Sequence, residues 1–150
     1  MSDDVRLADV TARNWRAVIG LKLAEDQKHL LASNIYSIAQ SKFDPDARPR
    51  AIYAGDTVVG FIMYDVPSAT DEPKEASIYR FMIDHAHQGK GYGRAALALA
   101  IDEIRAIPGI EMVSISYLRG NAIAKAFYAS FGFVETGDAG YGEINAELKL

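Results

Sequence analysis

Gln88-Gly89-Lys90-Gly91-Tyr92-Gly93 decides the fold class, because of the segments on either side of it. Residues 77–83 are aromatic and β-branched, which predicts a strand. Residues 94–101 are mostly strong helix formers. The order is therefore strand, glycine loop, helix. Glycines two positions apart allow positive φ and leave backbone N–H groups uncovered, and the following helix adds the positive end of its dipole. The stretch therefore predicts a loop that binds phosphate or pyrophosphate.

Two common phosphate loops do not fit this stretch. A Walker loop needs Lys followed by Ser or Thr at the start of the helix, where this chain has Tyr92-Gly93-Arg94. A dinucleotide fingerprint needs Gly-x-Gly-x-x-Gly and an acidic residue at the end of the next strand. Here the glycines are two apart throughout, and the next strand, 112–117, is followed by Leu118-Arg119. The spacing fits a different pattern, Gln/Arg-x-x-Gly-x-Gly.

A second pattern follows the first along the chain. Residues 121–133 fit Asn-x-x-Ala-x-x-x-Tyr-x-x-x-Gly-Phe. The two patterns, in this order, are signatures of the GNAT superfamily of N-acetyltransferases, which the chain resembles over nearly its whole length. Four further stretches resemble its bacterial spermine and spermidine acetyltransferase branch: 23–27, 33–40, 79–84 and 142–144. One departure is His85-Ala86-His87, where relatives often carry Pro-Glu-Tyr/Phe, and it bears on the conformation of the loop rather than on the cofactor class.

The resemblance implies an α/β fold, a three-layer α/β/α domain spanning residues 1–150. Its sheet is expected to be mixed and mostly antiparallel, with about seven strands and about four helices. Residue patterns predict strands at 5–8, 51–54, 58–64, 77–83, 112–117 and 144–150, and helices at 11–21, 27–39, from 94 to Pro108-Gly109, and 122–131. Prolines predict a loop over residues 44–49.

The helix predicted over residues 122–131 has two faces. Asn121 is a good N-cap residue and Gly132 a good residue to follow the C-terminus. One face is expected to pack on the sheet, and consists of Ile123, Ala126, Phe127, Ser130 and Phe131. The other is polar with one short side chain, and suits a ligand that runs alongside: Asn121, Ala124, Lys125 and Tyr128.

The resemblance implies that acetyl-CoA is the co-substrate and that no metal takes part. His85 and His87 lack an evident third ligand, which agrees with the absence of a metal site. A backbone N–H near the end of the 77–83 strand is expected to polarise the thioester carbonyl. The residues expected to bind the cofactor are Phe81, Met82, Ile83, Gln88, Gly89, Lys90, Gly91, Tyr92, Gly93, Arg94, Asn121, Ala124, Lys125 and Tyr128.

Acetyl transfer to an amine by direct attack needs a proton donor for the thiolate and a base for the ammonium. The resemblance makes Tyr128 the donor, and a phenol of pKa ~10 is still protonated at neutral pH. Any of four carboxylates could take the amine proton, directly or through water: Glu25, Glu75, Asp84 and Glu143. Glu25 ranks first as a cation-binding residue because it lies in a branch-like segment, and Glu75 and Asp84 are the other expected substrate-binding residues.

The branch resemblance implies a polyamine acceptor such as spermidine or spermine. Two alternatives stay open: the amine of an amino acid, an antibiotic or a protein N-terminus, and a non-catalytic module that senses acetyl-CoA. Arg80, in the middle of a predicted strand, is either a charge at the rim or a partner for a buried acid.

Composition narrows the class of protein. The net charge of −4 disfavours nucleic-acid binding and mildly favours cationic partners. The chain has no cysteine, which excludes disulfides and cysteine nucleophiles. No apolar run approaches the ~20 residues of a membrane span, and the acidic start does not look like a secretory signal. We therefore expect a cytoplasmic protein that binds neither membrane nor nucleic acid, and the resemblance alone implies a homodimer.

Overall fold

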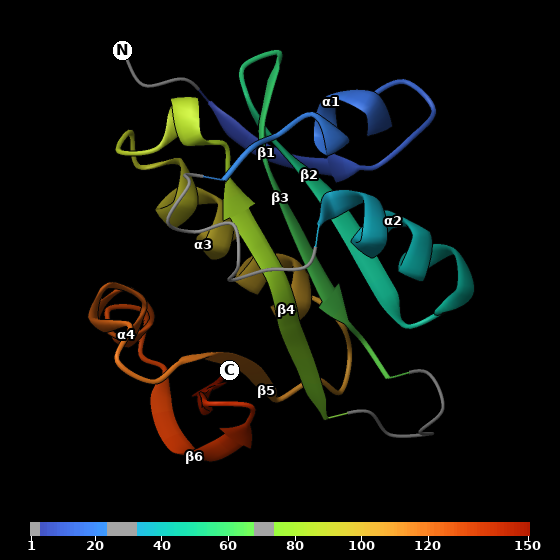
Figure 1. Ribbon diagram of the computed structural model, residues 1–150. Helices are drawn as coiled ribbons and strands as arrows, with labels where there is room; N and C mark the ends of the chain where they lie inside the picture. The colour runs from blue at the N-terminus through green and yellow to red at the C-terminus, as the bar shows by residue number, and fades with distance from the viewer. Residues whose placement is uncertain (1–3, 24–32, 68–73) are drawn as a thin grey trace.

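The computed structural model describes residues 4–23, 33–67 and 74–150 (Figure 1). Its elements are β1 (Val5–Asp9), α1 (Trp15–Ile19), α2 (Asn34–Phe43), β2 (Ala47–Ala54), β3 (Thr57–Asp65), β4 (Glu75–Ile83), the short 3₁₀ helix η2 (His85–His87), α3 (Tyr92–Arg105), β5 (Met112–Leu118), α4 (Ala122–Ala129), β6 (Val134–Gly140) and β7 (Glu143–Lys149). The seven strands form one sheet in the order β1-β2-β3-β4-β5-β7-β6. Only β4 and β5 pair in parallel, so the mixed, mostly antiparallel sheet is confirmed.

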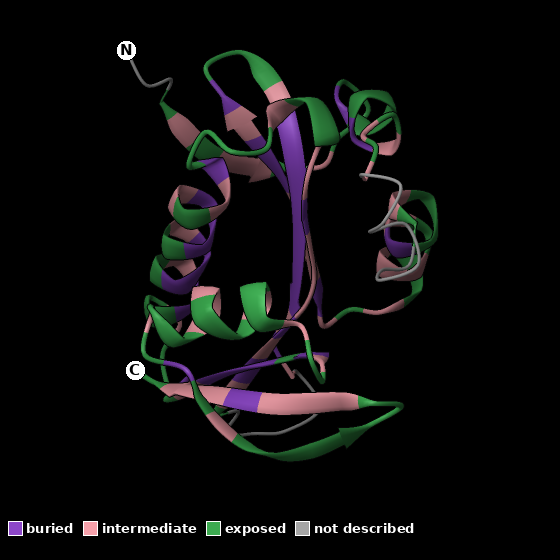
Figure 2. Cartoon of the chain, turned by 60° about the vertical axis from the view of Figure 1, so that its left-hand side comes forward, coloured by how far each residue is buried: buried purple, intermediate pink, exposed green. Residues whose placement is uncertain are grey.

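Helices cover both faces of this sheet, which confirms the three layers (Figure 2). The larger core cluster lies on the side of α3 and α4, and includes the predicted stripe of α3: Leu97, Ala100, Ile101 and Ile104, all buried. The smaller cluster lies on the other face, where Val18 of α1 and Ile38 of α2 meet Phe61 and Met63 of β3. Among the described residues, no helix is both long and apolar enough to cross a membrane.

The loop predicted over residues 44–49 is wrong in its second half, because β2 begins at Ala47. Pro49 lies within this strand and pairs with Met63 of β3. The pairing between β2 and β1 starts only at Arg50, so Pro49 lies where β2 has a single neighbour. Proline lacks an N–H and is tolerated at such an edge position.

The first two helices are also placed differently from the prediction. The α1 helix is confined to Trp15–Ile19, after a turn that begins at Thr11. The α2 helix starts after Ser33, whose hydroxyl accepts a hydrogen bond from the Tyr36 N–H at 3.1 Å, and it continues to Phe43 rather than ending at Ala39. The predicted turns over residues 27–32 lie outside the described residues. A strong N-cap thus sets the start of this helix.

Candidate active site

The sheet opens between β4 and β5. Their parallel pairing covers only three positions and stops at Ser77 and Ser114, although both strands continue beyond it. Figure 1 shows β5 turning away from β4 toward α4. Past Ser77, no described strand pairs with the edge of β4 that faces β5, so backbone N–H groups on this edge are available to a ligand. Phe81, Met82 and Ile83 lie on this open part of β4, and their binding of the cofactor stays a prediction.

A β-bulge lies in the middle of β4. The β3 strand pairs Tyr64 with Ile78 but Met63 with Arg80, so Tyr79 is the extra residue. Tyr79 packs against the core cluster on the side of α1 and α2. Burial and the neighbouring Asp65 carboxyl raise the pKa of Tyr79, which keeps its hydroxyl protonated at neutral pH.

The bulge turns Arg80 to the same side as Tyr79. Its guanidinium donates from Nε to the Ser37 hydroxyl of α2 at 3.1 Å and lies 5.0 Å from the centre of the Tyr79 ring. Among the described residues, no carboxylate lies within ion-pair distance of Arg80. The sequence left two roles for Arg80, a charge at the rim or a partner for a buried acid. The described residues contain no such acidic partner.

The glycine loop has the geometry that its sequence predicts. Gly89 and Gly91 have φ angles of 80° and 82°, and a Cβ on either would meet nothing within 4 Å. Gly91 is the N-cap of α3, so the positive end of the helix dipole lies at this loop. The Gln88 side chain donates to the Ile83 carbonyl oxygen at 3.0 Å, which ties the loop to the end of β4. A diphosphate fits these residues.

The predicted packing face of α4 is confirmed at Phe127 and Phe131 and wrong at its other positions. Ile123 is 85% exposed and Ala126 is exposed, although both were expected to pack on the sheet. The side of α4 that packs against the core carries Ala124, Phe127 and Tyr128, and continues to Phe131 just after the helix. Tyr128, which was expected on the ligand face, packs together with Phe127 and Phe131, and these three aromatic side chains determine how the helix lies.

Tyr128 is half-buried on this packed side of α4. Its ring stacks on Tyr117 of β5, with centroids 5.8 Å apart, and meets Phe133 edge-on at 5.7 Å. Burial and the neighbouring Tyr117 raise the pKa of Tyr128 to about 12. The phenol is therefore protonated throughout the physiological range and can donate a hydrogen bond or a proton.

The family is decided by a match that spans both sequence patterns. Residues 13–133 match the family model described as Acetyltransferase (GNAT) family. The chain belongs to this family. It is therefore an N-acetyltransferase by family, and acetyl-CoA is the co-substrate of the family. The glycine loop and the second sequence pattern are the two stretches that predicted this family.

Curated relatives and solved structures agree with the family. The spermine/spermidine N(1)-acetyltransferase of Bacillus subtilis (strain 168) is 26% identical over 137 residues, covering 89% of this chain and 90% of the relative. The GNAT domain of S. lividans PAT is similar in fold, with a TM-score of 0.78, 19% identity and coverage of 97% and 90%. The spermidine N-acetyltransferase from Vibrio cholerae in complex with CoA and spermine gives a TM-score of 0.76, 16% identity and coverage of 97% and 95%.

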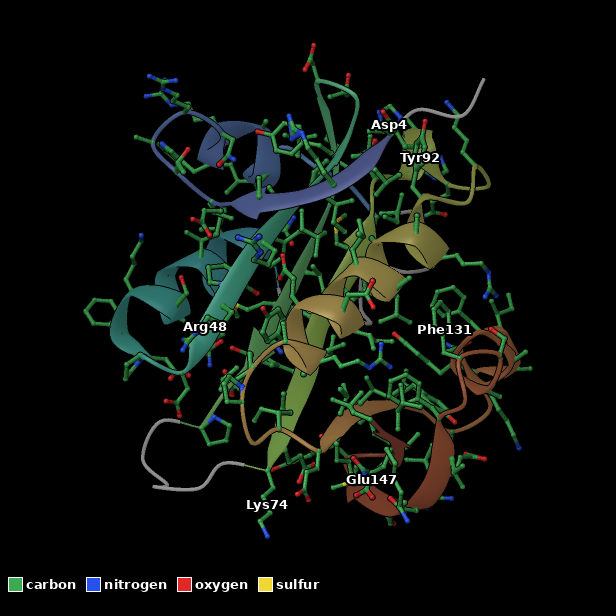
Figure 3. The ribbon with its side chains drawn as sticks, turned by 180° about the vertical axis from the view of Figure 1, so that it is seen from behind. Asp4, Arg48, Lys74, Tyr92, Phe131 and Glu147 are labelled. Carbon is green, nitrogen blue, oxygen red and sulfur yellow. The ribbon has the colours of Figure 1, made fainter. Side chains whose placement is uncertain are left out.

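In this GNAT chain, Arg94 joins the two helices beside the opening. It comes from the first turn of α3, donates to the Ser130 hydroxyl at 2.9 Å and lies over the rings of Phe127 and Phe131, 5.4 and 4.9 Å from their centres. Phe131 is labelled in Figure 3. The sequence indicated Arg94 only as a cofactor-binding residue. Its arrangement with α4 depends on a contact between residues 33 or more positions apart, which no local pattern reveals.

Two hollows formed by described residues adjoin the two sequence patterns. One, of about 310 Å³, is lined at the end of β5 and the start of α4 by Asn121 and Lys125, among others. Lys125 also forms an ion pair with Glu135 of β6 at 3.2 Å. The second, of about 340 Å³, lies between the start of β1 and the start of α3, where Asp4 and Tyr92 lie close together in Figure 3.

The candidate carboxylates occupy different places. Asp84 is already engaged, because its two oxygens accept hydrogen bonds from the N–H groups of Lys22 at 2.7 Å and Ala86 at 3.1 Å. Glu75 begins β4 opposite Met112, below the opening. Glu143 begins β7 opposite Leu118, at the far end of β5. Glu25 lies outside the described residues, so its predicted role as a cation-binding residue stays a prediction.

Proposed function

We propose that this chain transfers the acetyl group of acetyl-CoA to a primary amine of a polyamine such as spermidine or spermine. The observation that carries the proposal is the opening between β4 and β5, which lies between the glycine loop and Tyr128. The choice of a polyamine is supported by the relative from Bacillus subtilis and by the net charge of −4.

The residues around the opening suit direct attack. The glycine loop binds the diphosphate through its N–H groups, and an N–H on the open edge of β4 near Met82 or Ile83 polarises the thioester carbonyl. The amine nitrogen forms a bond to the carbonyl carbon while the carbon–sulfur bond breaks. Tyr128 supplies the proton to the thiolate, and a carboxylate or a water takes the proton of the amine. Glu25, Glu75 and Glu143 remain candidates for that base.

Initial rates of thiol release test this mechanism, with acetyl-CoA and spermidine both varied. Direct transfer requires both substrates on the protein together, so double-reciprocal lines are expected to intersect. Parallel lines would instead indicate a covalent acetyl-enzyme. The Tyr128→Phe variant is expected to lose tenfold or more in kcat, because only the hydroxyl is removed, and to lose much less in its affinity for coenzyme A.

The control for this variant is Tyr141→Phe, since Tyr141 is fully exposed in the turn between β6 and β7. This variant also removes one tyrosine hydroxyl, but from an exposed side chain. If both variants retain full turnover, Tyr128 is not the proton donor. If calorimetry detects binding of acetyl-CoA but no amine in a broad panel is acetylated, the chain is a sensor rather than an enzyme.

A second class of acceptor is favoured by Arg80. A half-buried guanidinium without a carboxylate partner among the described residues suits an acceptor that brings a carboxylate of its own. Such an acceptor is an amino acid or a peptide end rather than a polyamine. The same amine panel separates the two classes, because Arg80→Gln should lower kcat/KM only for acceptors that carry a carboxylate.

A further inference from the structure

The β5 and β7 strands present a polar surface on the side of the sheet opposite α3 and α4. Val113, Ile115, Tyr117 and Ala146 belong to the core cluster beneath those helices. Side chains alternate along a strand, so the residues between them face the other way: Ser114, Ser116, Asn145 and Glu147. The α1 and α2 helices on that side make their main sheet contacts with β3 and β2. Figure 2 shows β7 and β6 away from α1 and α2.

A row of side chains crosses three strands at the point where the opening starts. Ser77 of β4 pairs with Ser114 of β5, and Ser114 pairs in turn with Glu147 of β7. The two serine hydroxyls are 2.8 Å apart. The Asn145 amide nitrogen lies 2.8 Å from the Thr136 hydroxyl and 3.4 Å from a carboxylate oxygen of Glu147. Glu147 thus lies in the same row as Ser77 and Ser114, the last paired residues before the opening.

The direction of approach makes this surface relevant to the acceptor. The glycine loop precedes α3, and Tyr128 belongs to α4, so the cofactor is expected on their side of the sheet. An amine that attacks the same carbonyl carbon must then reach it through the opening from the opposite side. This is the side on which Ser114 and Glu147 lie.

Charged side chains of both signs lie on this side of the sheet. Across the opening, Arg80 faces the same side from β4. Among the described residues, neither Arg80 nor Glu147 forms an ion pair. Near the opening, Arg80 therefore repels a cationic acceptor and Glu147 attracts it. By the same alternation, Glu75 at the start of β4 and Glu143 and Lys149 at the two ends of β7 also face this side. We propose that Glu147 binds an ammonium group of the acceptor and so sets the orientation in which the acceptor enters the opening.

This inference rests on the proposed function, but its test does not need turnover. Spermidine is titrated by calorimetry into the protein saturated with coenzyme A. Glu147→Gln keeps the size of the side chain and removes its charge, so we expect the dissociation constant of spermidine to rise tenfold or more while that of coenzyme A stays unchanged. Glu147→Asp keeps the charge and should retain more of the affinity than Glu147→Gln. In rate measurements, the KM for spermidine should rise far more than kcat falls.

The matched control is Glu111→Gln, the same change at an exposed position just before β5. It tests whether a lower overall negative charge is enough to weaken binding. Affinity for spermidine within twofold of the wild type in Glu147→Gln, or an equal loss in both variants, overturns the inference. If the wild type binds spermidine through Glu147 but acetylates no amine, the proposed function fails while the binding role of Glu147 stands.

Discussion

Replacing Gly60 by alanine tests how tightly β3 fixes the end of β4. Gly60 pairs with Ile83, and a Cβ on Gly60 would lie 2.5 Å from the Met82 carbonyl oxygen, 2.8 Å from Ile83 Cδ1 and 3.1 Å from Ile52 Cδ1. Non-bonded heavy atoms prefer separations of about 3.5 Å, so the shortest contact is too close by about 1 Å. The atom in question belongs to the backbone of β4, which cannot rotate away. The strands must therefore move apart.

Overpacking of this kind costs ~1–3 kcal/mol, and we expect a loss of stability of about 3 kcal/mol for Gly60→Ala because the clash is with backbone. For a domain of this size each kcal/mol lowers Tm by ~2–4 °C, which gives a fall of roughly 6–12 °C. Urea and thermal unfolding measure both quantities. The kcat/KM for acetyl-CoA should fall as well, because Met82 and Ile83 line the opening.

The control for this change is Gly93→Ala. A Cβ on Gly93 would meet Ile83 Cγ1 at 3.6 Å and Phe81 Cζ at 3.8 Å, which are ordinary contacts. Alanine also has the higher helix propensity, so stability should stay level or rise by up to ~1 kcal/mol. A Gly60→Ala variant that melts within 1 °C of the wild type (about 0.3–0.5 kcal/mol) would refute the reasoning, since β4 would then have accommodated the added carbon without strain.

Two further predictions concern buried polar groups. Arg50 of β2 bridges Asp9 of β1 and Glu103 of α3. The Arg50→Ala variant should lose ~3 kcal/mol of unfolding free energy in urea, because Glu103 would keep a half-buried charge without its cation. A loss no larger than that of an exposed lysine variant would count against this prediction. Burial raises the pKa of Tyr64 and of Tyr128 to about 12. Their contribution to stability is therefore complete below the ordinary tyrosine pKa of ~10 and is lost as the pH rises toward 12, so unfolding free energies should decline over this interval and not between pH 7 and 9.

The parts of the fold that the sequence predicted are those set by short-range patterns. The strand, glycine loop and helix around residues 77–105 follow from β-branched residues, positive-φ glycines and a stripe at helical spacing, and each is present in the structure. The strands predicted over residues 51–54 and 58–64 are likewise present, as parts of β2 and β3, which pair as a hairpin. By contrast, the residues of β6 were not delimited, because two glycines and two irregularities in its pairing with β7 interrupt any alternation.

The orientation of α4 shows why a helical pattern alone was insufficient. Two overlapping faces of this helix had helical spacing. The face predicted to pack on the sheet included Ile123, which is almost fully exposed. The deciding contacts are made with distant residues: Tyr128 stacks on Tyr117, and Arg94 covers Phe127. The adjacent aromatics at 127 and 128 were the signal that could have found the packed face, since together they bury more area than any aliphatic pair on this helix.

The bulge in β4 has the largest consequence for function and the weakest local signal. Strict alternation would place Tyr79 and Arg80 on opposite faces of the sheet, whereas the extra residue brings both to the side of α1 and α2. Arg80 is thereby removed from the face of the glycine loop and donates to Ser37 of α2 on the other face. One inserted residue thus decides on which face of the sheet the Arg80 guanidinium lies. This is why the sequence left its role open.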